Sequence, residues 1–174
     1  MRLMHTTALA TAALALSLSA CSDDATSTAP SAGATSAWVL TAAPEGAKGV
    51  VELKTTAQEG DTVVLRGRIG GRMAPITEDS PVFVVMDLSI PHCGEKMDDH
   101  CPTPWDYCCE TVESKTDNAA TIQLVARDGM PLDESPMAQG FAALDEVIVV
   151  GTVGPRPNDK VLTVRATGVH RVGG

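Results

Sequence analysis

The chain has 174 residues, of which 44% are apolar, 20% are charged and 3% are aromatic. This length suffices for one domain with a hydrophobic core. Its 13 Lys and Arg residues stand against 22 Asp and Glu residues, which gives a formal net charge of −9. Nucleic-acid binding needs clustered cations for the phosphates and aromatic rings for base stacking. The composition therefore argues against nucleic acid as the main partner.

The first twenty residues have the features of an export signal. Arg2 provides a basic start, and residues 8–18 form an Ala- and Leu-rich run that is too short to span a bilayer. The run leads into the sequence LSAC at residues 18–21, which resembles the lipobox of bacterial lipoproteins. The resemblance implies cleavage before Cys21, a diacylglycerol on its sulfur and an acylated N-terminus, and several acyl chains anchor a protein stably. An ordinary secretory signal that happens to end in cysteine is the alternative.

We therefore predict a lipid-anchored protein of the cell envelope, with the membrane as its partner through the anchor. Ser22 resembles the sorting residue of outer-membrane lipoproteins in enteric bacteria, which places the protein at the outer membrane facing the periplasm. Residues 22–36 are small and polar, as in a flexible tether. The predicted organisation is a signal peptide at 1–20, a lipidated Cys21 with a tether at 21–43, and a folded domain at 44–174.

The folded part shows mostly alternating apolar and polar residues, a pattern typical of β-strands. Five segments have this alternation or the continuous apolar run of a buried strand: residues 61–69, 81–88, 119–126, 146–153 and 161–169. Ser135 can cap a helix and Pro136 suits its first position, so residues 135–144 predict a short helix. Residues 47–58 predict a second short helix.

Five strands with a helix after the third have the order of an OB-fold, a small Greek-key barrel. We therefore predict a mainly β fold, a five-stranded OB-like Greek-key barrel with one or two short helices. Another small sandwich or barrel is the alternative. OB-folds often bind oligonucleotides or sugars, but a fold by itself does not define a function. Arg66 and Arg68 share one face of a strand, where ion pairs or solvation are more common than an anion site.

The segment between the second and third predicted strands holds the unusual chemistry of the chain. Residues 91–110 contain four of the five cysteines, two of the four histidines and two of the five aromatic residues. They also contain carboxylates, so thiolate, imidazole and hard oxygen donors occur together. The residues singled out are Cys93, Cys101, Cys108, Cys109, His92, His100, Trp105 and Tyr107. We expect the two aromatic side chains to pack the loop onto the barrel.

Three interpretations of the four cysteines compete. Two disulfides suit an exported protein, and the number of cysteines is even once Cys21 is lipidated. A metal clamp, with His92 and His100 as additional ligands, suits zinc or copper(I), although the C-x2-C pairs of zinc ribbons are absent. The side chains of Cys108 and Cys109 point apart in an extended chain, which makes them awkward as joint ligands. A redox couple at these vicinal cysteines has the least support, because no C-x-x-C motif is present.

The sequence CPTPWDYCCE at residues 101–110 resembles a group of small exported bacterial proteins of uncharacterised function. They share a PWDYCC signature in an OB-like barrel, and the match extends upstream to Gly67, Ile69, Gly70 and Gly71. The resemblance implies the barrel architecture and the export, and it implies no activity.

The motifs of common enzyme classes are missing from the sequence. It has no P-loop, no G-x-G-x-x-G after a strand, no nucleophile elbow and no H-E-x-x-H, so an enzyme is not favoured. We predict a membrane-anchored extracytoplasmic binding module of unknown ligand, whose loop at 92–110 binds a transition metal. The alternative is a disulfide-stapled structural or partner-binding envelope lipoprotein without metal.

Overall fold

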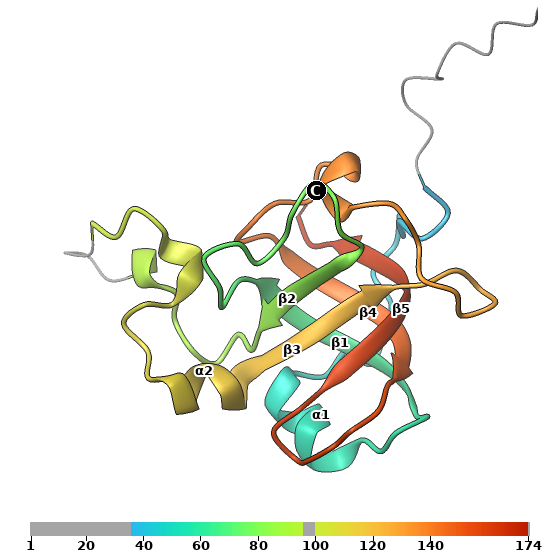
Figure 1. Cartoon of the computed structure of the whole chain (residues 1–174), viewed down its shortest axis with the longest axis horizontal. Helices are drawn as coiled ribbons and strands as arrows, with labels where there is room; N and C mark the ends of the chain where they lie inside the picture. Colours follow the sequence, from blue (N-terminus) through green and yellow to red (C-terminus); the bar gives the residue numbers. More distant parts are fainter. Residues whose placement is uncertain (1–35, 96–99, 174) are drawn as a thin grey trace, which may run out of the picture. The chain divides into compact units, whose positions relative to one another are not determined.

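The computed structural model describes residues 36–95 and 100–173, and these form a closed barrel of five strands. The strands are β1 (Thr62–Ile69), β2 (Val82–Met86), β3 (Ala119–Leu124), β4 (Glu146–Val153) and β5 (Thr163–Arg171). Their order around the barrel is β1-β2-β3-β5-β4, with β3 and β5 parallel and the other neighbours antiparallel (Figure 1). This is the order of an OB-fold barrel, so the predicted fold class is confirmed.

The alternating sequence of the strands determines which side chains fill the barrel. In β1 exposed and buried residues alternate, and Leu65 and Ile69 are fully buried. Val149 of β4 lies opposite Leu65 in the antiparallel register and is also fully buried. A slip by one residue would turn these apolar side chains to solvent, and each contributes about 1.5–3 kcal/mol when buried. The hydrophobic pattern therefore fixes the register that closes the barrel.

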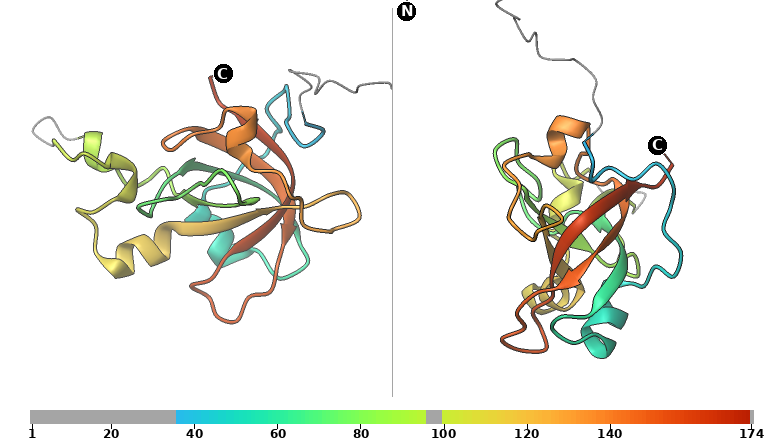
Figure 2. Two further views of the ribbon diagram at one scale, coloured as in Figure 1. Left: turned by 45° about the horizontal axis from the view of Figure 1, so that its top comes forward. Right: turned by 90° about the vertical axis from the view of Figure 1, so that its right-hand side faces the viewer.

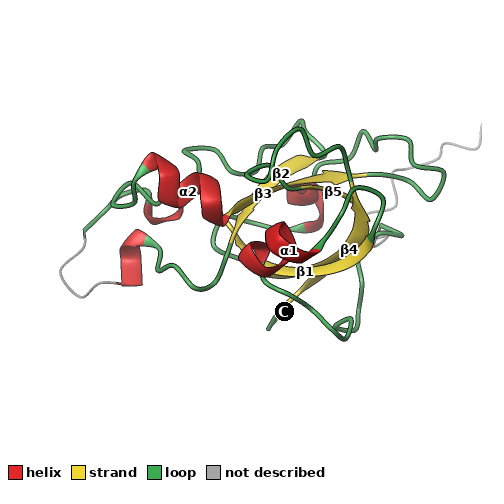
Figure 3. Ribbon diagram, turned by 90° about the horizontal axis from the view of Figure 1, so that it is seen from below, coloured by secondary structure: helices red, strands yellow, loops and turns green. Residues whose placement is uncertain are grey.

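Helix α1 (Val50–Thr56) lies across one end of the barrel (Figure 3) and confirms the helix expected within residues 47–58. Val50 and Leu53 point into the core. The helix has no capping side chain of its own, because its N-cap is Gly49.

The missing cap comes from Asp87, which follows β2. Its Oδ2 accepts a hydrogen bond of 3.0 Å from the backbone N–H of Val51. A Cβ atom on Gly49 would lie 2.7 Å from the same oxygen, so glycine gives the carboxylate room to approach the helix. Burial raises the pKa of Asp87, but hydrogen bonds from backbone N–H groups of Val51 and Ser89 outweigh it and hold the pKa below its usual value.

Two further helical segments follow in the second half of the chain. The 3-10 helix η3 (Pro136–Gln139) confirms the short helix expected at residues 135–144, and the Ser135 hydroxyl accepts from the N–H of Met137. Helix α2 (Val112–Asn118) was not predicted. Its N-cap Thr111 accepts a hydrogen bond of 3.1 Å from the N–H of Ser114. A capping threonine ahead of an acidic first turn is a signal that could have located this helix.

The chain packs on the barrel from Trp38 onward, ahead of residue 44, where the sequence placed the start of the folded domain. The indole ring is buried beside Phe141, with 5.6 Å between the ring centroids, and its Nε1 donates to Glu134 at 3.0 Å. Val39 bridges to Val169 of β5. The predicted signal peptide, Cys21 and the tether up to residue 35 lie outside the described residues. Within residues 36–95 and 100–173, no helix has the length and apolar character that a bilayer crossing requires.

Candidate metal centre

The segment between β2 and β3 stands out to one side of the barrel (Figure 2). Apart from α2, its described part has only two single turns of 3-10 helix, η1 (Cys93–Glu95) and η2 (Pro104–Asp106). A long segment with so little regular structure needs tertiary contacts to hold a fixed conformation.

The main anchor of this segment is the glycine pair that follows β1. The N–H of Gly71 donates to the carbonyl of Trp105 at 2.7 Å, and the indole Nε1 of Trp105 donates to the carbonyl of Met73 at 3.0 Å. Tyr107 is fully buried against Gly70, where an added Cβ would lie 2.8 Å from the ring carbon Cε2. The upstream glycines and the PWDYCC sequence, which are separate in the chain, are thus in direct contact.

A tight turn at Tyr107 directs the following cysteine. Tyr107 has a left-handed backbone with φ 55°. The Asp106 carboxylate supports the turn, because Oδ1 accepts from the N–H of Cys108 at 2.8 Å and Oδ2 accepts from the Thr103 hydroxyl at 2.9 Å. Burial raises the pKa of the Tyr107 phenol group overall, because it outweighs the nearby Arg68 guanidinium, which lowers the pKa. Tyr107 therefore acts as a neutral packing residue at this turn.

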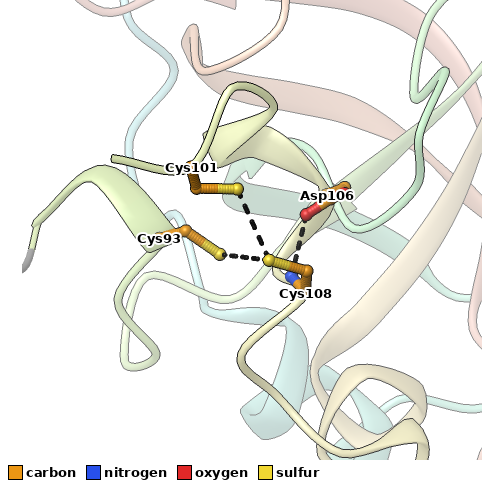
Figure 4. A group of neighbouring side chains, drawn as sticks. All are labelled: Cys93, Cys101, Asp106 and Cys108. Carbon is orange, nitrogen blue, oxygen red and sulfur yellow. Dashed lines mark hydrogen bonds between the residues drawn. The ribbon is translucent and has the colours of Figure 1, made fainter. Parts of the chain in front are cut away.

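Three cysteines and one aspartate converge beside this turn (Figure 4). The Sγ atoms of Cys93, Cys101 and Cys108 and one carboxylate oxygen of Asp106 all lie within 4.8 Å of one another. Cys108 is central, since its sulfur lies 3.4 Å from those of both Cys93 and Cys101. Cys93 is only 2% exposed, whereas Cys108 is exposed, so the cluster is open to solvent on one side.

The sulfur separations fit a metal ion better than a covalent bridge. Tetrahedral zinc with Zn–S bonds of about 2.3 Å holds its sulfurs about 3.8 Å apart, so a widening of a few tenths of an ångström would seat the ion. A disulfide needs about 2.05 Å. None of the four described cysteines is in a disulfide in the structure.

The pKa values of the Cys93 and Cys108 thiols are shifted in opposite directions. Burial raises the pKa of Cys93, but hydrogen bonds from the Cys109 backbone N–H and from the neighbouring thiols outweigh it and lower the pKa overall. The pKa of Cys108 is raised, because its hydrogen-bonding contacts with the sulfurs of Cys101 and Cys93 favour the protonated thiol. Cys93 therefore loses its proton more readily than Cys108.

The remaining candidate ligands lie outside this group. Both ring nitrogens of His92 have partners: Nδ1 accepts from the N–H of Gly94 at 3.1 Å, and Nε2 lies 3.3 Å from the Glu95 carboxylate. His100 is exposed and lies outside the group. Cys109 is not one of its four members, but its backbone N–H and its thiol hydrogen-bond to Cys93, and its thiol also hydrogen-bonds to Cys108. Residues 96–99, with their own donors, lie outside the described residues.

Asp106 is the member of the cluster that the sequence did not single out. Asp99 and Asp106 both stand two residues before a cysteine, so the sequence does not distinguish Asp106 from the other carboxylates of the segment. This spacing is typical of an aspartate that accepts the backbone N–H two residues ahead, as observed here. The same turn brings its carboxylate beside the three sulfur atoms.

Fold and site together define a five-stranded OB-like barrel that carries a thiol-rich candidate metal centre on the segment between β2 and β3. No protein-family model matches the chain, and no curated protein matches it.

Three solved structures are similar to the chain at low sequence identity. The hypothetical protein YgiW from E. coli is 18% identical, and the likeness covers 74% of this chain and 94% of that one at a TM-score of 0.38. A putative aspartyl-tRNA synthetase from Leishmania major Friedlin is 13% identical over 83% of this chain and 23% of its own, with a TM-score of 0.40. The aspartyl tRNA synthetase from Entamoeba histolytica is 10% identical over 80% and 26%, with a TM-score of 0.44. The chain spans about a quarter of each synthetase, and these likenesses concern the fold alone.

Proposed function

We propose that the chain is a membrane-anchored, extracytoplasmic metal-binding module. It holds one zinc ion through the thiolates of Cys93, Cys101 and Cys108, with the Asp106 carboxylate as the fourth donor. The observation that carries the proposal is the convergence of these three sulfur atoms and one oxygen within 4.8 Å.

The central position of Cys108 favours a metal ion over a disulfide. Its sulfur lies at the same distance, 3.4 Å, from two other sulfurs. A disulfide would use one of these contacts and leave the third thiol beside the bond. A metal ion would use all three sulfurs at once, and its positive charge would offset the repulsion between three neighbouring thiolates.

The donor set selects among transition metals. Copper(I) favours soft sulfur ligands alone, whereas zinc is borderline and accepts thiolates and carboxylates in tetrahedral sites. Each Asp106 oxygen already accepts one hydrogen bond, and a carboxylate oxygen has a second lone pair for a metal ion. Four protein donors leave no open coordination position, which is typical of a structural or storage site and not of zinc catalysis.

The proposal is tested by metal analysis of the full chain, exported and purified in detergent without reductant or chelator. We expect one zinc ion per chain by elemental mass spectrometry. Cobalt(II) in its place should give a thiolate charge-transfer band and the visible bands of a tetrahedral ion. Cys108→Ser should lose the metal and the bands. Glu113→Gln is the control, because it changes an exposed residue of the same segment outside the cluster, and it should keep both.

The opposite outcome is equally distinct. A chain without metal whose intact mass is lower by two hydrogens per bridge would reject the metal centre and establish the disulfide-stapled alternative. A stoichiometric copper ion in place of zinc would reject the choice of metal.

The anchor is tested separately. The full chain should partition into the detergent phase of a phase-separating detergent, and Cys21→Ser should abolish lipid labelling of the exported protein. Labelling that persists in Cys21→Ser would reject the lipoprotein assignment and would leave the metal result unaffected.

A further inference from the structure

A second site of interest is a groove on the outer surface of β2 and β3. The groove has a volume of about 390 Å³ and uses none of the four cysteines. Val84 and Thr121 lie opposite each other on neighbouring strands and line it. Their strand neighbours Phe83 and Ile122 are in the core, so alternation directs Val84 and Thr121 away from the barrel interior.

Three separate segments form the walls of this groove. One is the turn after β1, with Gly71 and Arg72, and another is α2, with Lys115. The third is the end of the loop between β4 and β5, with Lys160 and Leu162. Because three walls surround an apolar and polar floor, the groove can enclose part of a small molecule.

The charge of the lining is unusual for this chain. Arg72, Lys115 and Lys160 all line the groove, and no acidic side chain does so among the described residues, although acidic residues outnumber basic ones in the sequence. Lys160 pairs with Asp117 at 2.5 Å. No hydrogen bond or ion pair within the described ranges engages the guanidinium of Arg72 or the ammonium of Lys115.

A second and larger cavity, of about 540 Å³, shows the contrast. It is lined by Lys54 and Arg156 but also by Glu59 and Asp159, so both signs of charge are present. Arg156 there donates to the backbone carbonyls of Lys54 and Ala57 and is fully engaged in holding the fold. In the groove on β2 and β3, by contrast, Arg72 and Lys115 hold no other part of the described fold through their charged groups.

We infer that this groove binds a small organic anion that carries a phosphate or sulfate ester group. A cleft lined only by positive charges raises the local concentration of anions. Guanidinium and ammonium groups also donate charge-assisted hydrogen bonds to tetrahedral oxyanions. Val112 and the partly exposed Val161 supply an apolar surface for the organic body of the ligand. Val112 is 73% exposed without a ligand, so a bound molecule would cover apolar surface that now faces solvent.

The test uses phenyl phosphate as the probe and isothermal titration calorimetry on the full chain in nonionic detergent. We expect saturable binding of one phenyl phosphate per chain that weakens as salt is added. The double variant Arg72→Gln/Lys115→Gln should bind at least tenfold more weakly. Arg127→Gln is the matched control, because Arg127 is an exposed arginine outside the groove, and it should bind as the unaltered chain does.

Two further ligands define the chemistry. Inorganic phosphate should bind more weakly than phenyl phosphate, because it lacks the apolar body, and phenol should bind more weakly because it lacks the charge. Equal affinity for inorganic phosphate would overturn the organic ligand, and equal affinity for phenol would overturn the anion. Absence of saturable binding, or equal losses in the double variant and in Arg127→Gln, would overturn the site. Unchanged thermal unfolding of the variants, measured in parallel, ensures that a loss of binding reports the groove.

Discussion

Gly70→Ala is expected to destabilise the protein by moving the cysteine segment off the barrel. An added Cβ would lie 2.8 Å from Cε2 of Tyr107 and 2.9 Å from the carbonyl oxygen of Trp105. Neither neighbour can yield easily, because Tyr107 is fully buried and the Trp105 carbonyl accepts a hydrogen bond from Gly71. Contacts this short require a shift of the backbone or of the ring.

The magnitude follows from the cost of overpacking. Extra atoms in a tightly packed region destabilise by about 1–3 kcal/mol. For a domain of this size, such a change in the free energy of unfolding lowers Tm by about 3–10 °C. We also expect weaker metal binding, because Tyr107 precedes Cys108 and its displacement would move the central sulfur.

Gly154→Ala is the matched control for this substitution. Its added Cβ would meet atoms of Thr163 at 3.6 Å, which is an ordinary contact distance. We therefore expect its Tm to stay close to that of the unaltered chain, as measured by circular dichroism or calorimetry. Equal values of Tm and of metal affinity for Gly70→Ala and Gly154→Ala would refute the argument that the segment is anchored on Gly70.

Two further substitutions test the rest of the fold. Asp87→Asn removes the negatively charged cap of α1 and should cost about 0.5–2 kcal/mol near neutral pH. Because the pKa of Asp87 is lowered in the folded chain, its stabilisation is present above the unfolded pKa of about 3.9 and is lost as the pH falls through the folded pKa. The two chains should therefore converge in urea midpoint in acid, and a constant difference would contradict this. Trp38→Ala should cost about 3–5 kcal/mol by urea unfolding, against less than about 0.5 kcal/mol for the exposed control Met130→Ala. Equal midpoints for these two variants would show that Trp38 is dispensable to the folded domain.

The barrel could be predicted because successive side chains of a strand point to opposite faces, so burial of one face appears in the sequence as alternation of apolar and polar residues. The five expected strands all occur, and the segment at 146–153 has the observed bounds. The strand expected at 81–88 ends at Met86, since Asp87 leaves the sheet to cap α1. Helix α2 was missed because it has no apolar stripe, and none of its residues is buried.

The site was located by composition, but its geometry could not be predicted. Rare residues concentrated at 91–110 showed where the chemistry is. Which cysteines meet depends on the left-handed turn at Tyr107, and that turn depends on a contact with Gly70, which is distant in sequence. His92 was a reasonable ligand by residue type. In the structure, however, its Nδ1 contacts Gly94 and its Nε2 contacts Glu95, so both ring nitrogens are already engaged.

The two interpretations of the cysteines address one physical requirement. The described part of the segment buries few side chains, so the segment needs cross-links to stay closed. A disulfide between Cys93 and Cys108, which are 15 residues apart, would contribute about 3 kcal/mol in the chain-entropy model. A metal ion would also fix Cys101, which lies between them in the sequence, and so would divide the same loop into two shorter ones. A three-point cross-link requires Cys108 to contact both other sulfurs, as it does here. A single disulfide would use only one of these two contacts.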